Sequence, residues 1–248
     1  MSIWFVPRDA AARSMGADAV ASALEARGET VIRNGSRGML WMEPLIERAD
    51  ERHGPRVGWA NVTAGQIDAG LPDEQADNFI GVVEEFDYLA RQNRWIYERV
   101  GITDPVDPED YVAHGGLTGL KNALAMSGSD VVQAVTDSGL RGRGGAGFPA
   151  GIKWRTVADQ APAPHAGESQ NAPAHKYICV NADEGDSGTF ADRMLMEGDP
   201  FCLLEGMTIA AHAVGADRGL VYLRSEYPDA IATLQSAIWI AREQGWLG

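Results

Sequence analysis

Cysteine is scarce in this chain. Its 248 residues include two cysteines, Cys179 and Cys202. Two cysteines cannot build a disulfide framework or a four-cysteine metal site within the chain. The absence of a Cys-x-x-Cys motif before Cys179 also excludes thiol redox chemistry in the N-terminal part. Cys179 itself lies in an apolar run, which predicts a small buried hydrophobic residue.

Basic residues and long apolar runs are also few. Lysine and arginine total 21 against 35 acidic residues, and the formal net charge is −14. This balance excludes nucleic acid as the main partner, because phosphate backbones bind basic surfaces. No stretch reaches the ~20 apolar residues of a membrane span, and Arg8 and Asp9 interrupt the first apolar run too early for a signal peptide. We therefore expect a cytoplasmic protein without membrane insertion.

Glycine, in contrast, is concentrated in residues 139–151, which we call the glycine loop. Six glycines fall in these thirteen positions, and three cations lie among or just after them. The glycines are Gly139, Gly142, Gly144, Gly145, Gly147 and Gly151, and the cations are Arg141, Arg143 and Lys153. Glycine allows backbone N–H groups to approach a ligand, and successive N–H groups form a concavity that binds anions. The loop therefore predicts a site for a phosphate-bearing ligand, and a glycine-rich turn without a ligand is the alternative.

The loop also satisfies the dinucleotide fingerprint G-x-G-x-x-G, from Gly142 to Gly147. That fingerprint has to follow a strand and open a helix, with an acidic residue about 20 positions later. The preceding residues 129–138 instead predict a helix, with Ser129 as N-cap and Gly139 as C-terminal stop. The usual Rossmann interpretation therefore fails on context, whereas binding of phosphate remains possible.

The order of predicted elements indicates an α/β fold class in three parts. Residues 1–72 predict a small thioredoxin-like domain lacking cysteines, with a strand at 3–6, a helix at 9–26, a parallel strand at 30–33 and an edge strand at 56–62. Residues 73–128 predict a helical connector, with most of 74–100 helical. Residues 129–248 predict a Rossmann-like parallel α/β domain, with strands at 177–180 and 219–223 and helices at 201–213 and 229–243. This last domain is expected to be truncated, since another strand should follow Gly248.

An insertion and a polar strand end complete the pattern. Residues 159–175, rich in alanine and proline, predict a long exposed loop in which His165 and His175 are solvated. Directly after the strand at 177–180 come four polar residues, Asn181, Asp183, Glu184 and Asp186. Ligands of parallel sheets bind at the carboxyl ends of strands, and so many polar groups need ligands or hydrogen-bond partners.

A second polar strand end lies at residues 221–228. Together with the glycine loop, the two strand ends would surround one ligand that has both phosphate and hydroxyl groups. Flavin mononucleotide (FMN) has this combination: the loop takes its phosphate, and the acidic strand end takes its hydroxyls and ring. A divalent cation and an exposed acidic turn are the alternatives for residues 181–186.

Three stretches carry a family resemblance: LRGRGGAGFPAGIKW at 140–154, KYICVNADEGDSGTFADR at 176–193 and VYLRSEYP at 221–228. They resemble the family of 51-kDa flavoprotein subunits of NADH dehydrogenase over roughly residues 100–248. The resemblance implies hydride exchange between FMN and NAD(H), with no residue acting as nucleophile or general base. It implies cofactor contacts by Gly142, Arg143, Gly144, Gly145, Gly147, Phe148, Lys153, Asn181, Asp183, Glu184 and Asp186. Of these, Phe148 and Asp186 are expected at NAD(H), and many family members carry glutamate in place of Asp186.

The N-terminal part narrows the resemblance. FVPRDAAA at 5–12 and VIRNGSRGMLWMEP at 31–44 resemble the β (diaphorase) subunit of soluble, molybdenum-dependent, NAD-linked formate dehydrogenases. This implies a partner subunit that holds the molybdenum cofactor and a small thioredoxin-like subunit with a [2Fe–2S] cluster. The cysteines for a [4Fe–4S] cluster are expected beyond Gly248. The alternatives are the diaphorase subunit of an NAD-reducing hydrogenase, the respiratory flavoprotein subunit and, outside enzymes, a docking module of such a complex.

Overall fold

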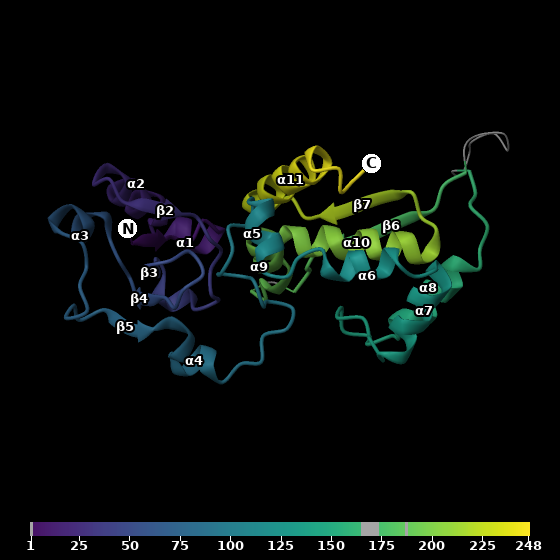
Figure 1. The fold of residues 1–248 in the computed structure, drawn as a ribbon, viewed down its shortest axis with the longest axis horizontal. Helices are drawn as coiled ribbons and strands as arrows, with labels where there is room; N and C mark the ends of the chain where they lie inside the picture. Colours follow the sequence, from purple (N-terminus) through teal and green to yellow (C-terminus); the bar gives the residue numbers. More distant parts are fainter. Residues whose placement is uncertain (1, 165–173, 187) are drawn as a thin grey trace.

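The first unit of the molecule is built on a five-stranded sheet (Figure 1). The computed structural model describes residues 2–164, 174–186 and 188–248. Within the sheet the strand order is β2-β1-β3-β4-β5, from β1 (Ile3–Phe5), β2 (Thr30–Ile32), β3 (Ile46–Ala49), β4 (Val57–Trp59) and β5 (Phe79–Val82). β2 is parallel to β1, and the other pairs are antiparallel. The parallel pair confirms the β-α-β arrangement predicted for residues 3–33.

Helices of the first unit pack beside this sheet. α1 (Ala10–Ser14) and α2 (Ala17–Ala26) connect β1 to β2, and α3 (Ala64–Ala69) follows β4. The prediction of one helix over residues 9–26 is wrong, because Gly16 has a φ of 100° and breaks it. The core between sheet and helices contains Trp4 and Trp59, whose ring centroids are 5.5 Å apart.

The helix predicted over most of residues 74–100 is also wrong. Residues 79–82 form β5 instead, and only α4 (Asp87–Ala90) and a 3-10 turn at 83–85 are helical. The apolar residues of this stretch are too closely spaced to separate a short strand from a helix. Pairing decides the outcome, because Phe79 lies opposite Trp59 on β4 and their rings pack at 5.3 Å. β4 is therefore an inner strand rather than an edge strand, and the sheet continues past residue 72.

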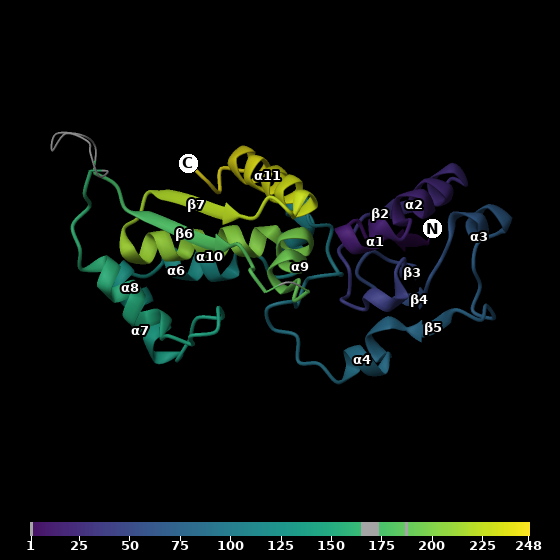
Figure 2. The ribbon, with the colours of Figure 1, turned by 180° about the vertical axis from the view of Figure 1, so that it is seen from behind.

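The second unit contains a two-stranded parallel sheet of β6 (Tyr177–Ala182) and β7 (Arg218–Leu223). One face of this sheet packs against α10 (Pro200–Val214) and α11 (Pro228–Glu243), and Figure 2 shows the two strands alongside α10. α9 (Ala191–Gly198) joins β6 to α10. These elements confirm the strand-helix alternation predicted for the last third of the chain. Within the described residues, no helix is long and apolar enough to cross a bilayer.

The opposite face of this sheet is open. Cys179 lies opposite Leu220 in the register, and Leu220 is 54% exposed. The prediction that Cys179 is buried is therefore wrong, since its side chain is on the face that α10 does not cover. Asn181 and Tyr222 form the next pair on the same face.

Four helices before the sheet complete the second unit. α5 (Pro108–Ala113) and α6 (Thr118–Leu124) follow the long connection from α4, and α6 packs on α10. α7 (Gly128–Asp137) and α8 (Ala150–Ala158) pack against each other and against α10. In the predicted loop at 159–175, residues 165–173 with His165 lie outside the described residues. His175 is half-buried rather than solvated, because its Nδ1 atom lies 2.6 Å from a carboxylate oxygen of Asp217.

Hydrogen bonds connect the two units. The backbone N–H of Ala10 donates to Oε2 of Glu197 at 3.0 Å, and the Asn34 side chain donates to the carbonyl of Gly101 at 2.7 Å. The backbones approach closely as well, since a Cβ atom on Gly35 would lie 2.8 Å from Cα of Gly198. Glycine at position 35 is therefore required by this contact.

Candidate functional site

The glycine loop connects two helices. α7 begins after Ser127, whose Oγ accepts a hydrogen bond from the N–H of Asp130 at 3.2 Å, so the N-cap is Ser127 and not Ser129 as predicted. Gly139 follows the helix with a φ of 69°, in agreement with its predicted role as the stop. The element before the loop is thus a helix, which confirms that the context of the Rossmann fingerprint is missing.

Hydrogen bonds within the loop close it into a hairpin-like shape. The N–H of Gly142 donates to the carbonyl of Phe148 at 2.9 Å, and the N–H of Ala150 donates to the carbonyl of Leu140 at 2.8 Å. The guanidinium of Arg141 donates to the carbonyl of Gly147 at 2.9 Å. Arg141 therefore stabilises the loop from inside, which its position among the glycines did not indicate.

Backbone N–H groups at the tip of the loop are free. Among the described residues, no acceptor receives a hydrogen bond from the N–H groups of residues 143–148. Gly145 and Gly147 have φ values of 96° and 61°, so the shape of the tip requires glycine there. At Gly144, an added Cβ would meet nothing within 4 Å. The tip is therefore an open cradle of N–H donors, in which a Cβ at Gly144 would occupy the space.

Side chains around the tip supply positive charge and an aromatic ring. Arg143 is exposed and forms no ion pair within the described part of the chain. The ammonium of Lys153, in α8, lies 6.0 Å from the ring centroid of Phe148, which is 46% exposed. Gly151 has a different role: a Cβ there would lie 2.3 Å from Oγ1 of Thr136, so this glycine allows α8 to pack on α7.

The acidic strand end is only partly available to a ligand. The carboxylate of Glu184 accepts hydrogen bonds from the N–H groups of Asp192 at 2.8 Å and Arg193 at 3.2 Å, and so caps α9. Oδ1 of Asn181 accepts from the N–H of Asp183 at 3.2 Å. The exposed carboxylates of Asp183 and Asp186 form no hydrogen bond or ion pair within the residues that the structure covers. These two carboxylates are therefore free to accept hydrogen bonds from a ligand.

Arg224 joins the two polar strand ends. Its guanidinium donates to the carbonyl of Glu184 at 2.7 Å and pairs with Glu226 at 3.4 Å. Hydrogen bonding to Arg224 lowers the pKa of Glu226, whereas burial and then the nearby charge of Glu184 raise the pKa of Asp192. The strand ends predicted at 181–186 and 221–228 thus meet in the structure.

The glycine loop is connected to these strand ends only through the core. No hydrogen bond or ion pair between described residues links the glycine loop with residues 181–186 or 221–228. Its flanking helices α7 and α8 pack on α10, which in turn contacts β6 and β7. The structure therefore places the predicted phosphate contacts and the predicted hydroxyl contacts around the same helix without direct contact between them.

The class of this second unit follows from comparison with known proteins. Residues 135–246 match the model of the Nuo51 FMN-binding domain. This stretch begins within α7 and ends after α11, so it includes the glycine loop and both strand ends. The match confirms the resemblance to the 51-kDa flavoprotein subunits of NADH dehydrogenase.

Individual relatives belong to several redox complexes. The chain is 46% identical over 158 residues to the NADP-reducing hydrogenase subunit HndC of Solidesulfovibrio fructosivorans, which covers 64% of this chain and 30% of the relative. It is 43% identical over 145 residues to an Escherichia coli (strain K12) subunit of NADH-quinone oxidoreductase, covering 58% and 30%. The chain thus spans 30% of the length of these relatives.

A solved structure is also similar. It is the NAD⁺-reducing [NiFe]-hydrogenase in the air-oxidized state, with a TM-score of 0.45 and 24% sequence identity over 98% of this chain and 41% of that chain.

Proposed function

We propose that this chain is the FMN- and NAD(H)-binding part of a diaphorase subunit, in which hydride is exchanged between NAD(H) and the flavin. The observation that carries the proposal is the run of free N–H groups at residues 143–148, beside the unpaired cation of Arg143. Phosphate groups bind to such backbone concavities because several N–H dipoles converge on one anion. The match of residues 135–246 to an FMN-binding domain supports FMN as the phosphate-bearing ligand.

Each predicted contact then has a separate role. The N–H groups of the loop, with Arg143 and Lys153, would hold the phosphate of FMN, and Asn181 and Asp183 would accept hydrogen bonds from its hydroxyls. The carboxylate of Glu184 caps α9, so its role would be to position the strand end rather than to contact the ligand. The flavin supplies the hydride chemistry when bound, and the protein positions the two rings.

Two residues are proposed at NAD(H). The ring of Phe148 is exposed beside the loop tip, where it can pack against a nicotinamide ring. The free carboxylate of Asp186 can accept hydrogen bonds from the cofactor. We therefore expect Asp186→Asn to raise the KM for NADH while flavin content stays the same. Loss of flavin with an unchanged KM would instead assign Asp186 to the FMN site.

We further propose that the complete protein is the β subunit of a molybdenum-dependent, NAD-linked formate dehydrogenase of the cytoplasm. The support is the N-terminal sequence resemblance and the absence of cysteine before Cys179. Its partners would be a subunit with the molybdenum cofactor and a small [2Fe–2S] subunit, and the full protein would also hold a [4Fe–4S] cluster. The relatives of the hydrogenase type favour an NAD(P)-reducing hydrogenase as the second candidate.

Metal analysis of the purified complex separates these candidates. Molybdenum that copurifies with formate-dependent reduction of NAD⁺ supports the formate dehydrogenase, whereas nickel with hydrogen-dependent reduction supports the hydrogenase. The diaphorase proposal itself is tested with an artificial electron acceptor. A complex that contains this chain but oxidises no NADH would leave only the docking function.

A further inference from the structure

Two histidines and a buried carboxylate meet between the two units, far along the chain from the glycine loop. His53 comes from the turn between β3 and β4, whereas Asp110 and His114 come from α5 and the residue that ends it. One ring nitrogen of each histidine and one carboxylate oxygen of Asp110 all lie within 4.8 Å of one another. These three groups are the ligand set of many transition-metal sites, namely two imidazoles and one carboxylate.

The local sequence explains why the helical pair faces one way. Asp107 caps α5 through the N–H groups of Glu109 at 2.9 Å and Asp110 at 3.2 Å, and Pro108 occupies the first turn. Residues four apart lie on one face of a helix, as in metal-binding helices with two ligands at this spacing. Nδ1 of His114 also lies 2.9 Å from the carbonyl oxygen of Asp110, and this contact fixes the orientation of the ring.

The two oxygens of Asp110 have different surroundings. Oδ2 accepts a hydrogen bond from the N–H of Asp104 at 2.9 Å and lies 3.3 Å from the guanidinium of Arg52. Oδ1 is buried and has no hydrogen-bond partner, although Nδ1 of His114 is 3.2 Å from it. The side chain of Asp110 is 3% exposed. A buried carboxylate oxygen without a donor is costly unless another group, such as a cation, satisfies it.

The remaining geometry suits a metal ion. A tetrahedral Zn²⁺ ion with ligands at about 2.0–2.2 Å separates its ligand atoms by roughly 3.4 Å. The pair formed by Asp110 and His114 already has nearly this spacing, and His53 is exposed, so its ring can move to complete the set. The rings of His53 and His114 are 4.9 Å apart. Solvent access at His53 leaves a fourth position for water.

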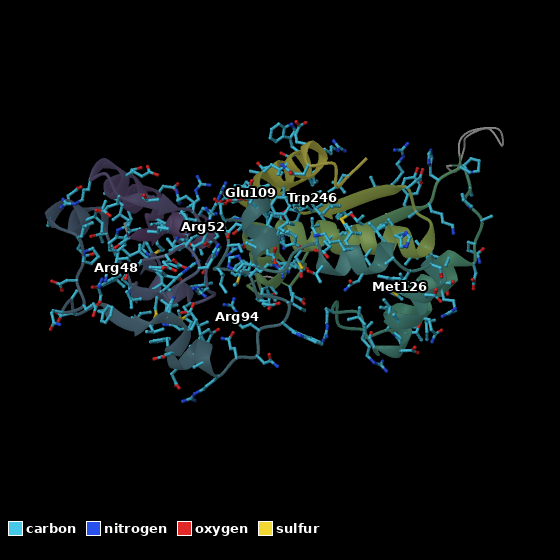
Figure 3. All side chains as sticks on the ribbon, in the orientation of Figure 1. Arg48, Arg52, Arg94, Glu109, Met126 and Trp246 are labelled. Atoms are coloured by element: carbon cyan, nitrogen blue, oxygen red, sulfur yellow. The ribbon has the colours of Figure 1, made fainter. Side chains whose placement is uncertain are left out.

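The charge around the cluster is compatible with a cation. Four carboxylates, those of Asp104, Asp107, Glu109 and Asp110, lie on or just before α5, and Arg52 is the cation that pairs with two of them. Figure 3 shows Arg52 and Glu109 at the junction of the two units. Arg52 is held through Asp107 at 2.6 Å, which leaves Oδ1 of Asp110 to the histidines.

We propose that His53, Asp110 and His114 bind a divalent transition-metal ion of the Zn²⁺ type, which ties the first unit to α5. The site is independent of the proposed FMN site, and it is structural, because it contains no substrate cavity of its own. The bound ion would add a bridge between the β3–β4 turn and α5, where the ion pair between Arg52 and Asp107 already connects them.

Equilibrium dialysis against Zn²⁺ tests this site in the purified complex after treatment with a chelator. We expect the wild-type chain to bind one more Zn²⁺ ion than the His53→Gln variant, and His114→Gln to weaken binding at least about tenfold. His53 is exposed, so its substitution does not threaten folding. The matched control is His212→Gln, because Nε2 of His212 contacts only the carbonyl oxygen of Met126 at 3.1 Å.

Thermal unfolding provides a second measurement. Zn²⁺ is expected to raise the melting temperature of the wild-type and His212→Gln proteins, and to leave that of His53→Gln unchanged, since an ion stabilises only the state that binds it. Equal stoichiometry and affinity in the wild-type and His53→Gln proteins would overturn the proposal.

Discussion

Gly144 differs from its neighbours in having no reason within the chain to be glycine. Gly145 and Gly147 need their positive φ values, and Gly151 needs the space that Thr136 would otherwise share with a side chain. Gly144 has neither an unusual φ nor a close neighbour. A ligand that approaches the backbone is the remaining physical reason for glycine at this position.

Stability measurements on two alanine variants separate these roles. Gly144→Ala is expected to change the free energy of unfolding by less than ~0.5 kcal/mol, because the added Cβ meets open space. Gly151→Ala is expected to cost about 1–3 kcal/mol, because its Cβ would overlap Thr136. Chemical denaturation of the ligand-free proteins measures both. Equal losses would show that Gly144 has a packing role that the structure does not contain.

Among the elements, α9 depends on a residue outside itself. The residue before this helix, Phe190, has a φ of 53° and supplies no side-chain cap. Glu184 caps the helix from the strand end instead, and its charge also favours the positive end of the helix dipole. One carboxylate therefore couples the start of α9 to the position of the acidic strand end.

Removal of this cap has a predictable cost. Glu184→Ala is expected to lower the free energy of unfolding by about 1 kcal/mol, and Glu184→Gln by less, since the amide keeps one acceptor oxygen. Glu226→Ala is the matched control, because that exposed side chain pairs only with Arg224 and Ser225 in the described chain, and stability should not change. Urea denaturation measures all three, and an unaffected Glu184→Ala protein would contradict the capping role.

The success of sequence-based prediction varied with the kind of element. The strands and helices of the last third were predictable because buried β-branched runs and long amphipathic helices differ in length and period. The stretch at 74–100 was not, because Phe79 joins a sheet through Trp59, a partner distant in sequence. At the site, the glycine loop was recognisable from its composition, whereas the capping role of Glu184 depends on a turn whose geometry leaves no pattern in the sequence.

On the scale of the whole molecule, buried acidic groups lie at the junction of the two units. Burial first raises the pKa of Glu197 to about 7, and the charge of Asp9 acts in the same direction, although Ala10 and Arg193 oppose it. In an unfolded chain this carboxyl has its ordinary pKa of 4.5. Between these values the folded state binds more protons than the unfolded state, so the free energy of unfolding falls as pH rises.

The pH dependence of stability is therefore expected to change in the Glu197→Gln variant. The stabilising contribution of Glu197 is fully present below pH 4.5 and is lost as pH rises through about 7. Glutamine imitates the protonated carboxyl, so the variant should match the wild-type near pH 5 and exceed it at pH 8 by on the order of 2 kcal/mol. Urea denaturation at several pH values checks this. A variant less stable than the wild-type at pH 8 would show that Glu197 is charged in the folded protein.

Flavin content tests the central claim, that the free N–H groups of the glycine loop hold the phosphate of FMN, most directly. The flavin released by denaturing the purified complex is identified by chromatography and quantified per chain for the wild-type and Gly144→Ala proteins. We predict stoichiometric FMN in the wild-type and a marked loss in Gly144→Ala, whose fold remains stable. A wild-type complex without FMN, or a variant with full occupancy, would contradict the claim.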